Sequence, residues 1–337
     1  MEKVLVTGTA GFIGFHVAEA LLKRGCHVVG MDSHTDYYDP TLKDARVARL
    51  TPYNRYTHHK LDLAESAKVM DVMAAEQPDA VINLAAQAGV RYSLEAPFDY
   101  TSANVTGFLS VLEACRAHPV KHLVFASTSS VYGANEAQPF REDHHTDHPV
   151  SLYAATKKAN EMMAHSYAHL FDIPMTGLRF FTVYGPWGRP DMALFKFTKA
   201  ILADEPIPLF NGGELSRDFT YVDDIVAGVL AALDNPPARD EAWDGQAPSP
   251  ATSGVAPYRL FNIGNSGPLP LMEFVEAIEQ ALGKKAKLNK LPMQAGDVVS
   301  THADTARLEA ATGYRPDTDV REGVANFVKW YRDYYGV

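Results

Sequence analysis

Short apolar runs alternate with longer amphipathic stretches over the first half of the chain. The apolar runs predict buried strands at Lys3–Thr7, His27–Asp32, Tyr56–Leu61, Ala80–Ala85, His122–Ser127 and Met175–Arg179. The stretches between them predict helices at Phe12–Arg24, Ala64–Glu76, Ser102–Ala117 and Tyr153–Phe171. Continuous apolar strands that alternate with helices are typical of parallel strands covered on both faces. Residues 1–180 are therefore predicted to form a doubly wound parallel α/β sheet, a Rossmann domain.

The pattern changes after Gly185, where prolines and glycines interrupt regular structure. Later segments predict a helix at Leu194–Ala203, a short strand at Ile207–Phe210, a helix at Val222–Leu233 and an aromatic-rich final helix at Val320–Tyr335 that docks on the body. Residues 236–257 are rich in Pro, Ala, Ser, Gly and Asp, which predicts a surface excursion. We expect residues 181–337 to form a smaller mixed α/β region that binds substrate, with some segments returning to the first domain.

Composition excludes several classes of partner. The formal net charge of −10 argues against nucleic acid and anionic membranes, although a few local Arg residues can still bind a phosphate. The two cysteines, Cys26 and Cys115, form no CxxC pair and are expected to be buried in a reducing compartment.

Histidines are frequent, but they do not predict a metal site. The pairs His58-His59 and His144-His145 have no carboxylate or thiol partner at ligand spacing, so we expect them on the surface and expect no metal. No apolar run reaches the roughly 18 residues of a membrane span, which favours a soluble cytoplasmic enzyme.

A glycine-rich turn, Gly8-Thr9-Ala10-Gly11-Phe12-Ile13-Gly14, joins the first strand to the first helix. Phosphates bind at helix N-termini because free N–H groups and the helix dipole both point at the anion. Glycines leave room there for a pyrophosphate. The spacing is G-x-x-G-x-x-G rather than G-x-G-x-x-G, and a tight turn without a ligand is the alternative. The position between strand and helix favours a dinucleotide site.

Acidic residues after the second and third strands indicate which dinucleotide binds. Asp32 ends the second strand, where a carboxylate accepts both adenosine-ribose hydroxyls and repels a 2′-phosphate. Ser33 follows and no Arg is adjacent, so NAD is favoured over NADP. Asp62-Leu63 is placed to reach the adenine, and an ordinary helix N-cap at Asp62 is the alternative.

Two further motifs carry candidate chemistry. Tyr153 and Lys157 form a YxxxK pair, which a helix places on one face. The Lys ammonium can then lower the pKa of the phenol, which acts as a base, and hold the nicotinamide ribose. Such a pair is common by chance, and its place after a dinucleotide turn gives it weight. The hydroxyl cluster Ser127–Ser130 follows the fifth strand and should face the crevice; a polar loop that caps a strand is the alternative.

Together these motifs resemble the extended short-chain dehydrogenase/reductase family. The resemblance rests on TGxxGFIG, the segments Asn83–Arg91 and Val131–Gly133, YxxxK, and Arg217–Asp224, and it covers nearly the whole chain. Within the family, residues Leu178–Ala193 closely resemble the UDP-glucuronate 4-epimerases.

The resemblance implies a UDP-sugar substrate, a tightly held NAD and catalytic roles for Thr128, Tyr153 and Lys157. The NAD site that it implies contains Gly8, Gly11, Phe12, Ile13, Gly14, Asp32, Asp62, Leu63, Leu84, Ala85, Ala86, Gln87, Asn104, Ser127, Tyr153, Lys157 and Phe180. The implied substrate site contains Arg91, Thr128, Ser129, Ser130, Tyr153, Phe181, Thr182, Arg189, Phe210, Arg217 and Asp297.

Three of these substrate residues have specific implied roles. Arg217 would bind the UDP pyrophosphate, Asp297 the uridine ribose, and Phe210 would lie near the uracil. Gln294 departs from the Arg of UDP-galactose 4-epimerases, which puts one phosphate contact in doubt. An ion pair between Arg217 and Asp218 on the surface is the alternative for that arginine.

A loop-capping role is likewise the alternative for Arg189. Two of the predicted helices, at residues 102–117 and 153–171, resemble the pair through which relatives dimerise. We therefore expect a homodimer.

The implied reaction is reversible C4 epimerisation of UDP-glucuronate to UDP-galacturonate through a 4-keto intermediate. Tyr153 takes the proton of the 4-hydroxyl, Thr128 steadies the oxygen, and the hydride stays on bound NAD until it returns. Related dehydratases and decarboxylases carry carboxylates after this Thr, where Ser129 and Ser130 stand here. We hypothesise that these hydroxyls, with Thr182, hold the sugar carboxylate out of alignment for CO2 loss.

Other functions remain open at this point. Among enzymes they are a 4-epimerase of a neutral UDP-hexose or UDP-N-acetylhexosamine, a UDP-glucuronate decarboxylase, and a reductase that consumes free NAD(P)H. From another class, the chain could be a non-catalytic dinucleotide sensor or an RNA-binding relative. Such proteins often lose the Tyr/Lys pair, which this chain keeps.

Overall fold

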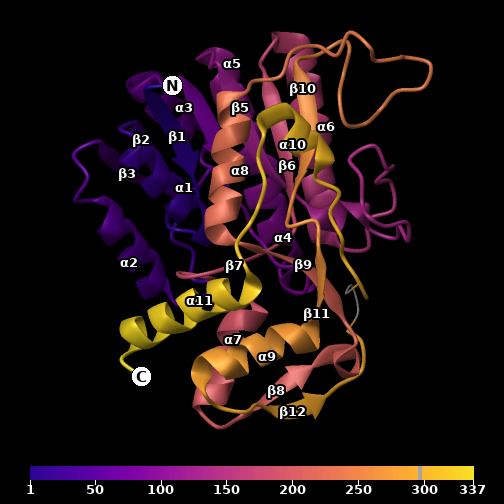
Figure 1. Cartoon of the computed structure of the whole chain (residues 1–337). Coiled ribbons are helices and arrows are strands. Elements are labelled where there is room, and N and C mark those ends of the chain that lie inside the picture. The colour runs from indigo at the N-terminus through magenta and orange to yellow at the C-terminus, as the bar shows by residue number, and fades with distance from the viewer. Residues whose placement is uncertain (295–297) are drawn as a thin grey trace.

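The computed structural model describes residues 1–294 and 298–337, and a seven-stranded parallel sheet forms the centre of this part of the chain (Figure 1). Its order is β10-β6-β5-β4-β1-β2-β3. The strands are β1 (Lys3–Thr7), β2 (His27–Asp32), β3 (Tyr56–Lys60), β4 (Ala80–Asn83), β5 (His122–Thr128), β6 (Met175–Phe180) and β10 (Tyr258–Ile263). The chain runs from β1 to one edge and then returns to β4 on the other side. This reversal confirms the doubly wound fold and creates a crevice at the carboxyl ends of β1 and β4.

Helices cover both faces of this sheet. One face carries α1 (Phe12–Lys23), α2 (Pro40–Leu50), α8 (Val222–Asp234) and α10 (Ala306–Thr312). The other face carries α3 (Ser66–Glu76), α5 (Gly107–Ala117) and α6 (Leu152–Phe171). Alternate strand residues divide between the two cores: Val4 and Val6 pack with α1, and Leu5 packs with α3 and α5. This two-sided burial explains why the strands read as continuous apolar runs.

A smaller region lies below the sheet in Figure 1. It contains a three-stranded sheet, a two-stranded sheet and three helices. Their bounds are β7 (Thr182–Tyr184), β9 (Ser216–Tyr221), β11 (Pro268–Pro270), β8 (Pro206–Leu209), β12 (Lys287–Lys290), α7 (Ala193–Leu202), α9 (Leu271–Leu282) and α11 (Val320–Tyr335). The final helix has the predicted bounds, and its aromatic side chains pack on the body, as in the contact of Trp330 with Trp187.

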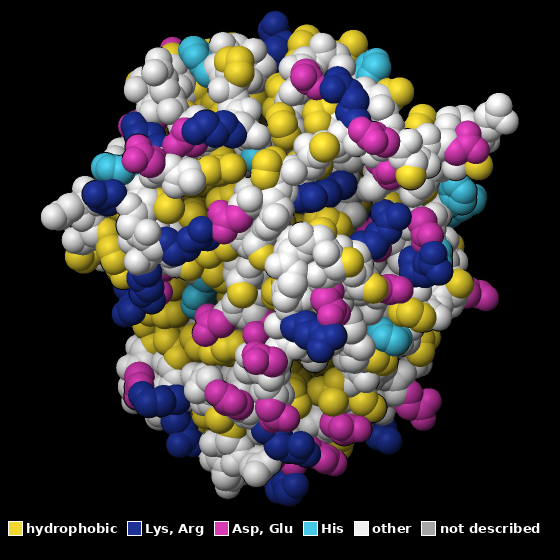
Figure 2. Space-filling model, turned by 45° about the horizontal axis from the view of Figure 1, so that its top comes forward, with side chains coloured by type: hydrophobic (Ala, Val, Ile, Leu, Met, Phe, Trp, Pro, Cys, Tyr) yellow, Lys and Arg dark blue, Asp and Glu magenta, His cyan; other side chains and the backbone are white. Residues whose placement is uncertain are grey.

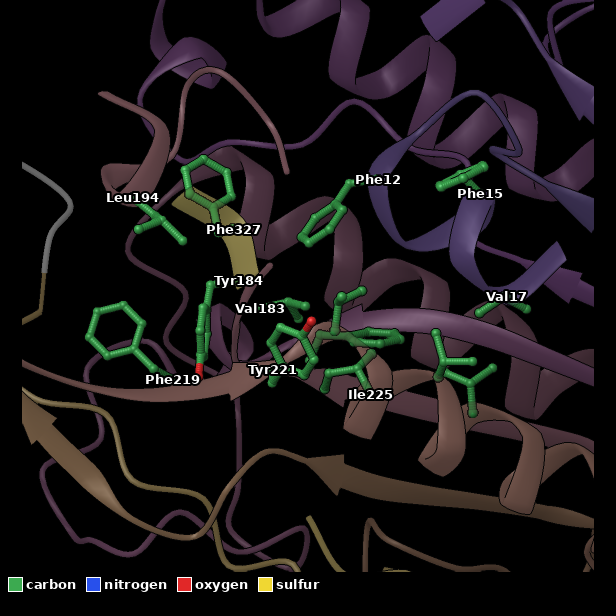
Figure 3. Close-up of a cluster of buried hydrophobic side chains, with 14 of the residues drawn as sticks. Phe12, Phe15, Val17, Val183, Tyr184, Leu194, Phe219, Tyr221, Ile225 and Phe327 are labelled. Carbon is green, nitrogen blue, oxygen red and sulfur yellow. The ribbon is translucent and has the colours of Figure 1, made fainter. Parts of the chain in front are cut away.

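The two regions share one hydrophobic core. Figure 3 shows Phe12, which belongs to the glycine-rich turn and begins α1, pointing into a cluster that contains Val183, Tyr221 and Phe327. Because the start of α1 contributes to this cluster, packing in the smaller region helps to hold the glycine turn in place.

Several predicted elements differ from the structure. The helix predicted at residues 102–117 begins earlier, with α4 (Pro97–Tyr100) and a π-helical stretch at Thr101–Thr106 before α5. The third strand is partly exposed because β3 lies at the edge of the sheet. The Pro-rich segment is exposed around residues 244–248, but Ala251 and Ala256 are fully buried beside β10.

Two expectations about single side chains also change. His58 is not a surface residue: its Nε2 lies 3.0 Å from Nε2 of His34, and burial lowers its pKa to about 4. His145 is exposed, as expected. Cys115 is fully buried, whereas Cys26, which directly precedes β2, is only partly buried.

Charges of both signs are interspersed over the face that Figure 2 shows. No described helix is long and apolar enough to cross a membrane.

Candidate active site

A cavity of about 290 Å³ lies at the carboxyl ends of the parallel strands. Most of its wall comes from the carboxyl edge of the sheet: the turn after β1, the ends of β2, β5 and β6, and the segments after β3 and β4. The loop before α2, helix α6 and the segment before α7 complete it. Of the residues assigned to the NAD site by resemblance, all line this cavity except Asn104. The amide of Asn104 instead binds the backbone of Gln87, with Nδ2 donating to Gln87 O and Oδ1 accepting from Gln87 N.

The glycine turn leaves no space for side chains. A Cβ atom on Gly14 would lie 2.0 Å from the carbonyl oxygen of Gly8, and Gly8 itself has φ +79°. Gly11 is the N-cap of α1, and no side chain caps this helix. The first turn of α1 therefore presents backbone N–H groups to the cavity, which fits the pyrophosphate of a dinucleotide.

Backbone amides hold the Asp32 carboxylate at the end of β2. Ala10 donates its N–H to Oδ2 at 3.0 Å, and His34 donates its N–H to Oδ1 at 2.8 Å. Asp32 still lines the cavity, so it can accept from ribose hydroxyls. Asp62 also lines the cavity and is not the N-cap of α3, because that helix begins at Ser66 with Glu65 as its N-cap.

Thr128, Tyr153 and Lys157 come together on one wall of the cavity. The ammonium of Lys157 donates to the carbonyl of Ala126 at 2.9 Å, and burial lowers its pKa to about 8. Thr128 Oγ1 donates to Ser130 Oγ at 3.3 Å. The hydroxyl loop therefore faces the crevice through Thr128, while Ser129 and Ser130 lie outside the cavity lining.

The electrostatics of Tyr153 differ from the expectation. Burial raises the pKa of the phenol, and a hydrogen bond to Thr128 and the charge of Arg189 oppose this rise. Lys157 was expected to lower the pKa of Tyr153, but its ammonium is bound to Ala126. In the protein alone, Thr128 and Arg189 are the groups that favour the phenolate.

The candidate substrate residues fall into two groups. Phe181 and Arg189 line the cavity, and Thr182 begins β7 outside its lining. Farther along, the guanidinium of Arg91 lies 4.8 Å from the centre of the Phe210 ring, although the two residues are far apart in sequence. Asp297 lies outside the described residues.

Arg189 and Arg217 have partners other than those that the sequence suggested. Arg189 forms a bidentate ion pair with Asp191, through Nε at 3.0 Å and Nη2 at 2.5 Å. Arg217 donates to the carbonyls of Ser216 and Val299. The proposed surface pair with Asp218 is wrong, because Asp218 is fully buried and accepts backbone N–H groups.

A buried ion pair beneath the site was not predicted from the sequence. Arg179 of β6 donates from Nε and Nη2 to Glu161 of α6, at 2.8 and 2.9 Å, and both side chains are fully buried. The Ser127 hydroxyl donates to the same carboxylate at 2.7 Å. The available signal was an Arg inside an apolar strand, which requires a partner.

Another buried acid lies next to this pair. The carboxyl of Glu142 accepts the backbone N–H of Asn262 at 2.8 Å, and burial raises its pKa to about 7. Tyr37, Tyr38 and Lys43 were also missed; they line the cavity from α2 and the loop before it. No motif marked them, since that helix was not predicted.

Comparisons with known proteins agree with this geometry. The model of the NAD dependent epimerase/dehydratase family matches residues 4–244. Protein CapI of Staphylococcus aureus is 51% identical over 99% of this chain and 99% of its own length. A probable UDP-glucuronate 4-epimerase of Rhizobium meliloti is 50% identical over 99% of this chain and 98% of its own length. The crystal structure of a UDP-glucuronic acid 4-epimerase from Bacillus cereus, with UDP-glucuronic acid and NAD, superposes with a TM-score of 0.87 at 32% identity, covering 99% of this chain and all of that one.

Glu142→Gln is expected to improve stability most at neutral and higher pH. The folded wild-type protein favours the protonated carboxyl of Glu142. The stability that this protonation contributes is fully present below pH 4.5 and is lost as the pH rises through about 7. Over this pH range the free energy of unfolding of the wild type should fall by about 3 kcal/mol, and that of the Gln variant should not. Urea unfolding at pH 5 and pH 8 measures the difference. Glu136→Gln, an exposed position in the same segment, is the control; an equal pH dependence in wild type and Glu142→Gln would contradict the prediction.

Proposed function

The chain belongs to the NAD-dependent epimerase/dehydratase family, and we propose that it interconverts UDP-glucuronate and UDP-galacturonate by inverting C4 of the sugar. One observation carries this choice. Among the described residues, the only acids that line the cavity are Asp32 and Asp62, and both lie at the adenosine end. The end that holds Tyr153 offers hydroxyls and cations.

This distribution of charge selects among the reactions open to a 4-keto sugar. Elimination of water needs an acid and a base beside C5 and C6, and carboxylates usually supply both. Epimerisation needs no further acid or base, only space for the keto sugar to turn over. A wall near Thr128 that carries hydroxyls and cations but no carboxylate favours epimerisation.

NAD, when bound, supplies a reversible hydride acceptor for C4. The chain itself moves the proton. Tyr153 is the proposed base for the C4 hydroxyl, and it returns the same proton when the sugar is reduced on its other face. Thr128 hydrogen-bonds the phenol, and the nearby Arg189 charge favours its ionised form. Lys157, held by Ala126, keeps a positive charge next to the site at neutral pH because its pKa is about 8.

The hydroxyl loop supports a second part of the proposal. A 4-keto glucuronate is a β-keto acid, and it loses CO2 when its C5–C6 bond lies parallel to the carbonyl π system. We propose that Ser129, Ser130 and Thr182 hold the carboxylate away from this alignment; they lie next to the cavity lining, and Ser130 is hydrogen-bonded to Thr128, which belongs to it. Arg189 is already paired with Asp191, so it does not clamp the carboxylate and the sugar stays free to turn.

We also propose a homodimer that is formed through α5 and α6. These helices leave large apolar side chains exposed: Leu109 at 40%, Met162 at 50% and Leu170 at 64%. Exposed large apolar side chains on neighbouring helices are typical of a protein interface.

Purified protein incubated with UDP-glucuronate and no added cofactor should form UDP-galacturonate. Tyr153→Phe should reduce the rate by about 100-fold or more, because the base is lost. Tyr335→Phe, a partly exposed residue at the end of α11, is the control. The products are identified by chromatography and mass spectrometry. Conversion of UDP-glucose but not UDP-glucuronate would contradict the proposal, and so would net consumption of NADH.

Ser130→Ala should release decarboxylated product. Loss of one hydrogen bond to a carboxylate corresponds to about 1.5–3 kcal/mol, so the ratio of UDP-pentose to UDP-galacturonate should rise roughly tenfold or more. Mass spectrometry of the reaction mixture measures this ratio. Ser66→Ala, at the exposed start of α3, is the matched control. An unchanged ratio in Ser130→Ala would rule out this role for the loop.

A further inference from the structure

A fully buried arginine of α2, Arg46, contacts segments that are far apart in the chain. None of its surface is exposed. In the part of the chain that the structure describes, its guanidinium has oxygen partners but no carboxylate among them, and its Nε has no hydrogen-bond partner. A buried cation without a carboxylate depends on the hydrogen bonds that it makes to other oxygens. The segments that supply these oxygens are therefore held to Arg46.

Four oxygens accept hydrogen bonds from this guanidinium. Its Nη1 donates to the carbonyl of Ala10 at 2.8 Å and to the hydroxyl of Tyr38 at 2.7 Å. Its Nη2 donates to the carbonyls of Trp187 and Gly188, at 2.7 and 3.3 Å. Because a guanidinium is a rigid planar fork, it fixes the distance between these two sets of partners. Arg46 thus joins the glycine turn to residues 187 and 188.

Residues 185–188 form a turn that needs such support. Trp187 has φ +62°, a backbone conformation that a bulky side chain adopts only where its surroundings impose it. From α1, Nε2 of His16 donates to the carbonyl of Pro186 at 2.9 Å. The Trp187 ring also packs on Trp330 of α11, with the ring centres 5.3 Å apart. Three helices therefore hold this turn, and two of them bind its carbonyl oxygens.

The 185–188 turn leads directly to Arg189. This arginine lines the cavity, and its charge is one of the groups that oppose the rise in the pKa of Tyr153 caused by burial. The interaction of a charge with an ionising group weakens with distance. The position of the turn therefore governs how strongly Arg189 favours the phenolate of Tyr153.

We propose that Arg46 is a positioning residue that, together with His16, holds the 185–188 turn so that the Arg189 charge stays beside the Tyr153 phenol. The inference rests on the proposed function, in which Tyr153 is the base. Arg46 does not line the cavity, so it acts through the turn rather than by touching a ligand. Since Arg46 also binds Ala10, it fixes Arg189 relative to the glycine turn.

The other groups that face Tyr153 are the same in every comparison that tests this role. They are Thr128, which hydrogen-bonds the phenol, Tyr100, whose ring centre lies 6.0 Å away, and Lys157 on the same helix, with a pKa of about 8. Burial lowers the pKa of His16 to about 4, so His16 stays neutral where a phenol titrates. A difference between variants therefore reports the 185–188 turn.

The test measures the ionisation of Tyr153 directly. The ultraviolet absorbance of tyrosinate is titrated against pH in protein with bound NAD, and the titration of the same variant carrying Tyr153→Phe is subtracted. Wild type is compared with Arg46→Lys and with His16→Leu. Arg49→Met is the matched control, because this exposed arginine of the same helix lies over the Trp187 ring, at 5.5 Å, without binding the backbone of the turn. The readout requires no substrate.

Arg46→Lys keeps the charge, but one ammonium cannot replace a fork that binds two segments. The midpoint of the Tyr153 titration should therefore rise by about half a pH unit or more, since the Arg189 charge moves away from the phenol. This rise corresponds to about threefold less phenolate at a pH well below the midpoint. His16→Leu should shift the midpoint in the same direction, and it tests the same turn if Arg46→Lys does not fold. His16→Gln, which keeps a donor, and Arg49→Met should both retain the wild-type midpoint.

A double-mutant comparison separates this role from a general effect on the fold. In a background with Arg189→Gln and Asp191→Asn, which removes the ion pair as a unit, Arg46→Lys should move the midpoint no further. An equal movement in this background would overturn the inference, and so would an unchanged midpoint in both Arg46→Lys and His16→Leu. Failure of the wild type to form UDP-galacturonate would instead contradict the proposed function, and it would leave the titration readable.

Discussion

The buried ion pair of Glu161 and Arg179 is the interaction on which the geometry of the site depends. An unpaired charge in this position would cost several kcal/mol, so the fold must keep α6 and β6 in the one arrangement that joins the two groups. Glu161 lies one helical turn beyond Lys157, and its carboxylate also accepts the Ser127 hydroxyl at the end of β5. The same contact thus aligns the helix that carries Tyr153 with the loop that carries Thr128.

The pair also ties the cavity to the rest of the molecule. The Arg179 guanidinium lies 4.9 Å from the centre of the Tyr132 ring, and the Tyr132 hydroxyl donates to Asn262 of β10. On the opposite face of the sheet, Phe12 packs against the smaller region, which fixes the glycine turn (Figure 3). The charges near Asp32 and the hydroxyls near Thr128 are therefore held on rigid elements, as the proposed return of proton and hydride to the same sugar requires.

The doubly wound fold, six of the seven central strands and the NAD cofactor could be predicted from the sequence, because the strands and the glycine turn depend on local periodicity and on close backbone packing. The dinucleotide site at the glycine turn stays a prediction. It could not reveal β10, which follows a Pro-rich segment, or α2, whose apolar residues are few. It also missed Lys43 and the Glu161–Arg179 pair, since both act through contacts between distant segments. Burial raises the pKa of Tyr153, and one of the groups that oppose this rise is Arg189, which follows β7 in the chain and which the fold places near the phenol.

A double-mutant cycle on the buried pair tests this account most directly. Glu161→Gln leaves the Arg179 charge buried without its partner and should lower the free energy of unfolding by about 3–5 kcal/mol, with loss of epimerase activity. Replacing both residues, Glu161→Gln with Arg179→Met, should cost less than the sum of the two single changes by more than about 1 kcal/mol. Glu113→Gln, which removes an exposed ion pair with Arg116, should change stability by less than about 1 kcal/mol. Additive single effects, or full stability and activity in Glu161→Gln, would contradict the central role of this pair.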